Sequence, residues 1–379
     1  MDFDLSVAQR KRFADIGSAV LERFGELPPA TRPQLTRPEW KAAADLGLAG
    51  LCLPAEYGGQ GLGALDTALC LEAFGRSCPD TGLVFALCAH LLACAVPVRD
   101  FAGDEVRGTL LSGLASGDLI AANAMTEDDA GSDVGHLATT AQPVDGGYLL
   151  DGEKSFASNA PIADLIVTYA VTDRSAGFLG ISAFAVPREL DGISVGPPFS
   201  KMGLSSCPAA RVRFERCFVP RRYLLGEDGG GAAIFQHSMG WERSCLFAGY
   251  LGLMDRQLEQ CVEHARERRQ FGRRIGGFQA VSHRIAGMKQ RLEGARLLLY
   301  RACWLLDEGR EHVEQTALAK VAVSEAAVAN SLDAVQIFGG AGYLSPTGIE
   351  RQLRDSVPAM IFSGTTDIQR ELIAREVGL

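Results

Sequence analysis

The sequence predicts an α+β protein in which a β-rich middle part separates two helical parts. Apolar residues recur at helical spacing in the first and last parts, whereas β-branched and aromatic residues alternate from about residue 120 onward. The glycine-rich stretch GEDGGG at residues 226–231 indicates a linker. The 379 residues suffice for two or three domains. We expect an N-terminal helical domain at 1–120, a β domain at 121–228 and a C-terminal helical bundle at 229–379.

The N-terminal part contains several helix signals. Residues 3–24 have apolar positions at helical spacing, and Thr36, Pro38 and Glu39 supply a cap, a first-turn proline and a capping-box acid for a second helix that Gly47 ends. The longest uncharged run, residues 81–98, falls short of the roughly 20 apolar residues of a membrane span. We therefore expect a buried core helix there and no membrane segment.

The spacing of apolar residues also predicts the elements of the middle and last parts. Strands are expected at residues 147–150, 165–171, 181–186 and 212–219, with a hairpin turn at Asp145-Gly146-Gly147. Three long helical patterns come after the linker, at about residues 232–268, 279–307 and 313–338. Arginine and glutamate alternate there with leucine, alanine and methionine, which is typical of helices in a bundle.

Composition excludes several classes of function. The formal net charge of −9 disfavours a nucleic-acid-binding protein, which needs a basic face for phosphates. No secretory signal is visible in MDFDLSVAQRKRF, so we expect a cytoplasmic protein. The ten cysteines are scattered through apolar stretches, and the sequence has neither a CxxC pair nor an HExxH motif. We therefore expect no metal site.

Four separated segments carry the functional signal. They are Met125–Asp133 (MTEDDAGSD), Lys154–Asn159 (KSFASN), Arg268–Gly272 (RRQFG), and Gln336–Gly340 (QIFGG) with Arg354-Asp355 and Ile361–Thr365 (IFSGT). Together and in this order they resemble the signatures of the acyl-CoA dehydrogenase family over essentially the whole chain. The resemblance implies an N-terminal helical domain, a middle β-barrel or sandwich and a C-terminal four-helix bundle.

The resemblance also implies FAD as the cofactor, because such a site must hold a planar flavin, its pyrophosphate and a thioester. Met125, Thr126, Phe156 and Ser158 would line the isoalloxazine ring, with Phe156 at a position that tryptophan usually occupies. Four further residues would reach FAD across a subunit interface in a homotetramer, namely Arg268, Phe271, Gln336 and Gly340. Thr365 and Asp367 complete the expected cofactor-binding set.

Dehydrogenation of a thioester needs a carboxylate to accept the α-proton, and burial raises the pKa of such a group toward neutrality. In much of the family that glutamate precedes the Gly-Thr of the fourth segment, where this chain has Ser363. Other members place it on the first helix of the bundle, immediately before an arginine. The tripeptide Trp241-Glu242-Arg243 matches that arrangement, so Glu242 is the expected catalytic base. The resemblance further implies that the backbone N–H of Ser363 polarises the thioester carbonyl.

Finer resemblance indicates the substrate. Segments 62–69, 87–91, 159–164, 282–284, 300–304 and 361–365 are similar to the dehydrogenases that oxidise L-prolyl groups on peptidyl carrier proteins to pyrrole-2-carboxyl groups in natural-product pathways. Ser132 would meet the phosphopantetheine arm of the carrier. Trp241 would narrow the substrate pocket or belong to the core. Two alternatives stay open: a short- or branched-chain acyl-CoA dehydrogenase, and a flavin-free interaction protein on the same fold.

Overall fold

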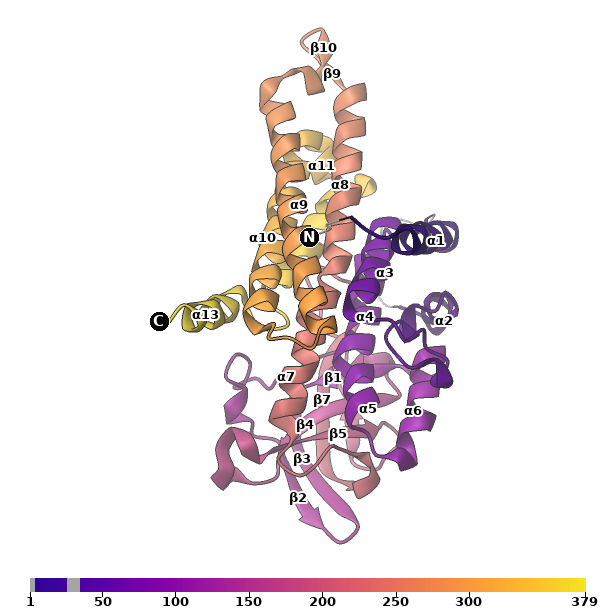
Figure 1. Ribbon diagram of the computed structural model, residues 1–379, viewed down its shortest axis with the longest axis vertical. Helices are drawn as coiled ribbons and strands as arrows, with labels where there is room; N and C mark the ends of the chain where they lie inside the picture. Colours follow the sequence, from indigo (N-terminus) through magenta and orange to yellow (C-terminus); the bar gives the residue numbers. More distant parts are fainter. Residues whose placement is uncertain (1–3, 26–34) are drawn as a thin grey trace.

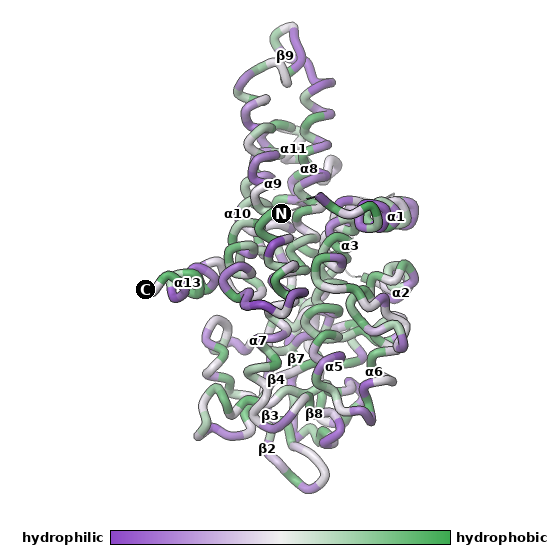
Figure 2. The backbone as a smooth tube through the Cα atoms, in the orientation of Figure 1, coloured by the Kyte–Doolittle hydropathy of each residue, from purple (hydrophilic) through white to green (hydrophobic). Residues whose placement is uncertain are grey.

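The computed structural model describes residues 4–25 and 35–379 and has three parts, as the sequence predicts. Figure 1 shows the sheet at one end of the long axis and the tip of the helical bundle at the other. The predicted helix at residues 3–24 is observed as α1 (Val7–Phe24), and Phe3 lies outside the described residues. Figure 2 shows hydrophilic and hydrophobic residues alternating along α1, whereas α3 (Ala64–Ser77) is largely hydrophobic.

The helix signals read from the N-terminal part are confirmed. The Thr36 side chain caps α2 (Arg37–Asp45) by accepting from the Glu39 N–H, and Glu39 completes the capping box. Gly47 ends this segment in the left-handed conformation with φ 76°. After α3 the chain forms α4 (Thr81–Cys88), the π-helix η3 (Ala89–Ala95), α5 (Val96–Phe101) and α6 (Asp104–Ser116).

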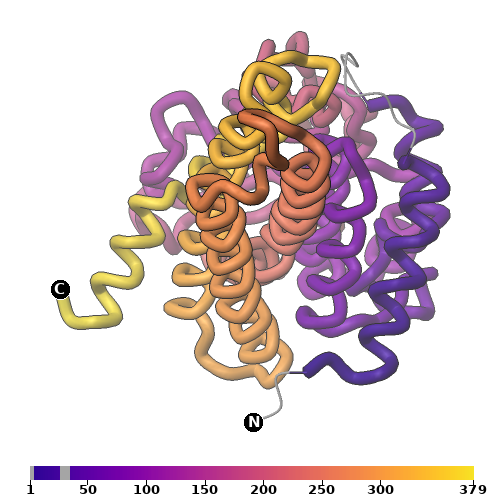
Figure 3. Tube along the Cα trace, turned by 90° about the horizontal axis from the view of Figure 1, so that it is seen from above, coloured from indigo at the N-terminus to yellow at the C-terminus, as the bar shows by residue number. Residues whose placement is uncertain are grey.

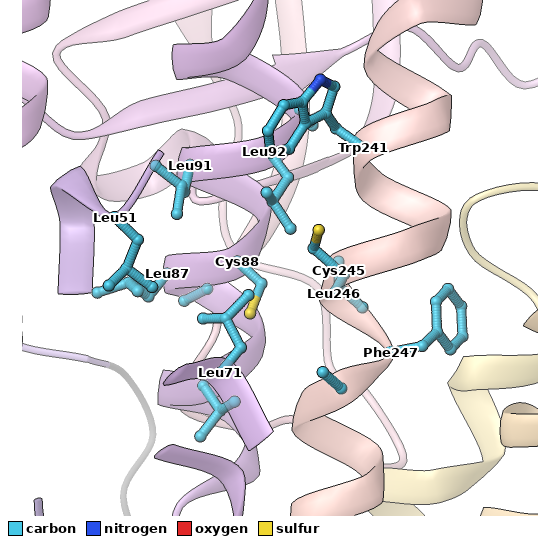
Figure 4. Packing of buried hydrophobic residues seen from close by; sticks show 14 of the residues in the cluster. Leu51, Leu71, Leu87, Cys88, Leu91, Leu92, Trp241, Cys245, Leu246 and Phe247 are labelled. Carbon is cyan, nitrogen blue, oxygen red and sulfur yellow. The ribbon is translucent and has the colours of Figure 1, made fainter. Parts of the chain in front are cut away.

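Residues Thr81–Phe101 form one apolar helix long enough to cross a membrane, within the part of the chain that the structure describes. The whole of its apolar window is buried inside the protein. Figure 4 shows Leu92 of this helix on the side of Trp241 and Cys245, while Leu87 and Leu91 lie on the side of Leu51. The helix is therefore a core helix, as predicted.

The middle part is one eight-stranded sheet with the order β6-β7-β3-β1-β4-β5-β8, and β2 pairs with β3 and β4. Its strands are β1 (Ala121–Ala124), β2 (Thr140–Val144), β3 (Gly147–Ser158), β4 (Leu165–Val171), β5 (Ile181–Pro187), β6 (Ile193–Val195), β7 (Ala209–Pro220) and β8 (Leu224–Leu225). The predicted hairpin joins β2 to β3 through Asp145 and Gly146, which has φ 74°. Leu165, Val167 and Tyr169 face the helices, while alternate residues of β4 face a second apolar cluster.

The C-terminal part begins with α7 (Gly231–Trp241), the π-helix η8 (Glu242–Leu246) and α8 (Ala248–Glu267). A short hairpin of β9 (Arg269–Gln270) and β10 (Arg273–Arg274) turns the chain into α9 (Gln279–Asp307), which is followed by α10 (Val313–Phe338). The single helix expected at 232–268 is therefore interrupted at Glu242.

The chain ends with α11 (Gly340–Tyr343), α12 (Ile349–Ser356) and α13 (Thr366–Glu376). Figures 1 and 3 show α13 extending away from the body of the chain. The loop between α12 and α13 contains Ser363 and lies against the start of α8 through aromatic contacts. This loop and the π-helix η8 position the candidate site.

Candidate active site

Glu242 is the first residue of the π-helix η8 and is 7% exposed. Its Oε2 atom is buried and has no hydrogen-bond partner among the described residues. The other π-helix, η3, packs against η8 from the N-terminal part of the chain. Figure 4 shows Cys88, just before η3, and Cys245 of η8 pointing into the space between the two helices. π-Turns of this kind are frequent at functional sites.

Ser363 lies directly beside this carboxylate. Its Oγ donates a hydrogen bond to Oε1 of Glu242. Arg243 donates from Nε to the carbonyl oxygen of Ser363 over 3.0 Å. The start of η8 therefore holds Ser363 at both its side chain, through Glu242, and its backbone, through Arg243, although 121 residues separate Glu242 from Ser363.

The surroundings of the Glu242 carboxyl raise its pKa, as expected for a general base. Burial raises its pKa above the ordinary value, and the Ser363 hydroxyl and the Arg243 charge oppose only part of that increase. Burial also lowers the pKa of Arg243, which is 8% exposed. A carboxylate whose pKa is raised toward the working pH is better suited to accept a proton.

The residues predicted to line the flavin ring come together at the ends of β1 and β3. Ser158 pairs with Asn123 of β1, and the Ser155 N–H donates to the Thr126 carbonyl over 2.7 Å. Met125 is buried between them. Phe156 has φ 56° and is 61% exposed, so the backbone holds an aromatic ring outward in a conformation that L-residues rarely adopt.

A buried ion pair anchors this segment. Lys154 is 0% exposed and its Nζ lies 2.8 Å from Oε1 of Glu127, which is 6% exposed. Lys154 also donates to the Met125 carbonyl, while Glu127 accepts from the backbone N–H groups of Ala138 and Thr139. The charge and these hydrogen bonds outweigh the effect of burial and lower the pKa of Glu127 below its ordinary value. The polar loop after β1 is thereby fixed to β3.

The second part of the predicted cofactor set lies elsewhere. Arg268 ends α8 and Phe271 sits in the β9–β10 hairpin, at the end of the bundle farthest from the sheet (Figure 1). Phe271 is 92% exposed with φ 50°. Gln336 and Gly340 are exposed near the C-terminal end of α10, and no atom lies within 4 Å of the position that a Cβ on Gly340 would take. One chain therefore does not bring these four residues to Glu242.

The remaining predicted residues differ in their surroundings. Thr365 caps α13 by accepting from the Ile368 N–H, and Asp367 is exposed beside Arg370. Ser132 is exposed in the loop after β1. Trp241 is 8% exposed, belongs to the main apolar core and lies beneath the Arg99 guanidinium at 4.5 Å. The structure thus places Trp241 in the core, and its contact with a substrate stays a prediction.

Three features of the site were not anticipated. The first is the side chain of Ser363 as a partner of Glu242, for which the only signal was a serine where much of the family has its base. The second is the Lys154–Glu127 pair, which lies within two recognised segments. The third is Phe362, whose ring centre lies 4.7 Å from Phe85 and 5.4 Å from Phe247. Contacts across such long sequence separations leave no local pattern.

Fold, buried carboxylate and sequence segments together define an acyl-thioester dehydrogenase. Models of the acyl-CoA dehydrogenase N-terminal, middle and C-terminal domains match residues 19–118, 122–217 and 229–378. The chain belongs to the acyl-CoA dehydrogenase family and is an FAD-dependent oxidoreductase.

Individual relatives resemble the chain in both sequence and structure. An L-prolyl-[peptidyl-carrier protein] dehydrogenase of Pseudomonas fluorescens is 53% identical and is covered, like this chain, over 100% of its length. The solved structure described as PigA with FAD and proline has a TM-score of 0.97 at 44% identity and full coverage of both chains. The prolyl acyl carrier protein oxidase AnaB has a TM-score of 0.94 at 37% identity, over 99% of this chain and 100% of that one.

The residues present fit FAD in two places. At the ends of β1 and β3, the exposed ring of Phe156, held by a backbone with positive φ, offers an aromatic neighbour to a planar group, and Thr126 and Ser158 provide short hydroxyl side chains in the same segments. At the far end of the bundle, Arg268 and the open glycine turn at Gly339-Gly340 suit a pyrophosphate and its nucleotide. These two places lie far apart along the long axis of the molecule (Figure 1).

Proposed function

We propose that this protein oxidises an L-prolyl group, carried as a thioester on a peptidyl carrier protein, to a pyrrole-2-carboxyl group in natural-product biosynthesis. The observation that supports the proposal best is the 53% identity, over the full length of both chains, to an L-prolyl-[peptidyl-carrier protein] dehydrogenase. The solved structure PigA with FAD and proline supports the same substrate class. Buried Glu242 supplies the base that this chemistry needs.

Each residue of the site has a defined task in this proposal. Glu242 accepts the proton from the α-carbon of the prolyl thioester, whose acidity comes from the adjacent carbonyl. The backbone N–H of Ser363 donates to the thioester oxygen, where negative charge develops as the proton leaves. FAD supplies the acceptor for the hydride that leaves the substrate in the same oxidation. Each oxidation removes two electrons, so a second one is needed to reach the aromatic ring.

The carrier partner and the subunit arrangement are parts of the proposal. Ser132, exposed beside the flavin segment, is the proposed contact for the phosphopantetheine arm. A homotetramer would bring Arg268, Phe271, Gln336 and Gly340 of one subunit to the FAD that a neighbouring subunit holds against Phe156. All ten cysteines are free and buried, which is compatible with a reducing cytoplasm as the proposed location.

Arg268→Ala is expected to weaken FAD binding by roughly 10- to 100-fold, because hydrogen bonds to a charged phosphate contribute about 1.5–3 kcal/mol. FAD titration followed by flavin fluorescence measures this change, and sedimentation shows whether the assembly persists. Arg266→Ala is the matched control, because Arg266 is also exposed at the end of α8. Equal affinity in wild type and Arg268→Ala would contradict the assignment.

The substrate proposal is tested by intact-mass spectrometry of a peptidyl carrier protein loaded with L-proline and incubated with the FAD-loaded enzyme. We expect the loss of four hydrogen atoms from the prolyl group. A carrier protein loaded with alanine tests whether the proline ring is required. Isovaleryl-CoA tests whether the carrier protein is required. Oxidation of isovaleryl-CoA with no change in the prolyl carrier would assign the chain to acyl-CoA oxidation instead.

A further inference from the structure

Ser363 occupies a position at which its backbone conformation is unfavourable for a residue with a side chain. Its φ is 56°, in the left-handed region that glycine favours, and the next residue is Gly364 with φ 83°. Such strain persists only where the surrounding structure holds it, and it concentrates at functional sites. A side chain at Ser363 therefore requires an explanation beyond folding, because glycine would fit the same backbone without strain.

The loop around Ser363 is held from three sides. Phe362 packs against Phe85 and Phe247, with ring centres 4.7 and 5.4 Å apart. Arg243 donates from Nε to the Ser363 carbonyl over 3.0 Å. A Cβ on Gly364 would come within 2.6 Å of Nε2 of Gln369, so this side chain closes the loop from the start of α13. The position of the Ser363 Cβ is accordingly fixed relative to η8.

The fixed side chain meets only one of the two oxygens of Glu242. The Ser363 hydroxyl donates to Oε1, whereas Oε2 is buried without a partner among the described residues. A carboxylate held through one oxygen cannot rotate freely, and its other oxygen keeps both lone pairs available. We propose that the Ser363 side chain is a positioning residue for the base, and that it makes Oε2 of Glu242 the oxygen that accepts the substrate proton.

The step is a simple proton transfer. The bond between the α-carbon and its hydrogen breaks, the electron pair stays on the substrate, and a bond forms between the proton and Oε2. Throughout the transfer, the Ser363 hydroxyl keeps its own proton and continues to donate a hydrogen bond to Oε1. The inference rests on the proposed role of Glu242 and adds a residue that acts through it.

The pH dependence follows from the groups around the carboxyl. Arg243 of η8 and the Ser363 hydroxyl lower the pKa of Glu242, while burial raises it by more. The other titratable groups facing it are Cys88 of α4, Cys94 of η3 and Tyr169 of β4, whose own pKa values are raised chiefly by burial and also by the charge of Glu242. These three are neutral near pH 7, so removing the hydroxyl leaves Arg243 as the one neighbour among the described residues that still lowers the pKa of Glu242.

The experiment compares Ser363→Ala and Ser363→Gly with the wild type by following flavin reduction as a function of pH. Both variants lack the hydroxyl, but only glycine relieves the backbone strain. We expect the acidic limb of the rate profile to move to higher pH in both variants, because hydrogen bonding to the charged form lowers a pKa. The rates should recover most of their loss at high pH. Ser244→Ala is the control, since this buried hydroxyl has no hydrogen-bond partner among the described residues.

A second readout does not depend on turnover. The protonated Glu242 carboxyl has an infrared carbonyl band, which is identified by its absence in Glu242→Gln, and its midpoint pH should rise in both Ser363 variants. Unchanged midpoints in both Ser363 variants would overturn the positioning role, because a hydroxyl that holds the ionised carboxylate also lowers its pKa. Failure of the proposed base is a separate result: Glu242→Gln would then keep its activity, whatever the Ser363 variants do.

Discussion

Glu242→Gln is expected to retain FAD but to lose flavin reduction by about 10³-fold or more, within the range that a positioned general base contributes. The amide has nearly the shape of the carboxylate and can still accept the Ser363 hydrogen bond, but it cannot accept a proton at neutral pH. Folding should be preserved, because the replacement removes a buried charge rather than an apolar contact.

Stopped-flow measurement of flavin bleaching under anaerobic conditions tests this expectation directly. Visible absorbance of the purified variant reports whether FAD is bound, and thermal unfolding reports whether the fold is intact. Glu263→Gln provides the matched control, because Glu263 is an exposed glutamate on α8. Reduction of Glu242→Gln at the wild-type rate would remove Glu242 from the catalytic role.

The sequence predicted the order of the parts and many element boundaries because local rules determine them. Thr36 and Glu39 form the predicted capping box, and the predicted helix at 313–338 is observed as α10 with the same bounds. The short strand β1 was not predicted individually. Its four residues, AANA, have little β-propensity, and pairing with β3 and β4 stabilises the strand instead.

The site could be predicted only in part, for a physical reason. Glu242 was found because a helical position next to an arginine matches a family pattern, and the structure places it in a buried environment that raises its pKa. The Ser363 hydroxyl contact depends on a positive φ and on the packing of Phe362 against two distant aromatic rings. Neither feature has a signature in the local sequence. Arg268 and Phe271 lie at the end of the bundle farthest from the sheet, so their contact with an FAD shared between subunits stays a prediction.

Lys154→Met is expected to lower the free energy of unfolding by about 3–5 kcal/mol, because removing one partner leaves a buried charge without compensation. The Glu127 carboxylate would stay buried, and its remaining partners among the described residues would be the N–H groups of Ala138 and Thr139. The loop after β1 would lose its attachment to β3, so FAD affinity should fall as well. Denaturant unfolding and FAD titration measure the two effects.

Two further variants separate the unpaired charge from the lost packing. Glu127→Gln combined with Lys154→Met removes both charges and should recover much of the stability, as replacement of a whole buried pair often does. Arg213→Met should change stability by less than about 1 kcal/mol, because the Arg213–Glu215 pair is exposed. A double variant as unstable as Lys154→Met would show that the aliphatic packing of Lys154, not the ion pair, is what the fold requires.

The pH dependence of the stability of Lys154→Met gives the sharpest test of the Lys154–Glu127 ion pair. In the wild type the pKa of Glu127 lies below its unfolded value, so its contribution is present above that unfolded value, about 4.3, and is lost as the pH falls through the lowered pKa. Without Lys154, burial dominates and places the pKa of Glu127 above the unfolded value. Acidification then favours the folded state of the variant at this group, because the buried carboxyl takes up a proton. The stability difference between wild type and Lys154→Met should therefore shrink as the pH falls from 7 toward about 4, and a constant difference would contradict a buried, paired Glu127.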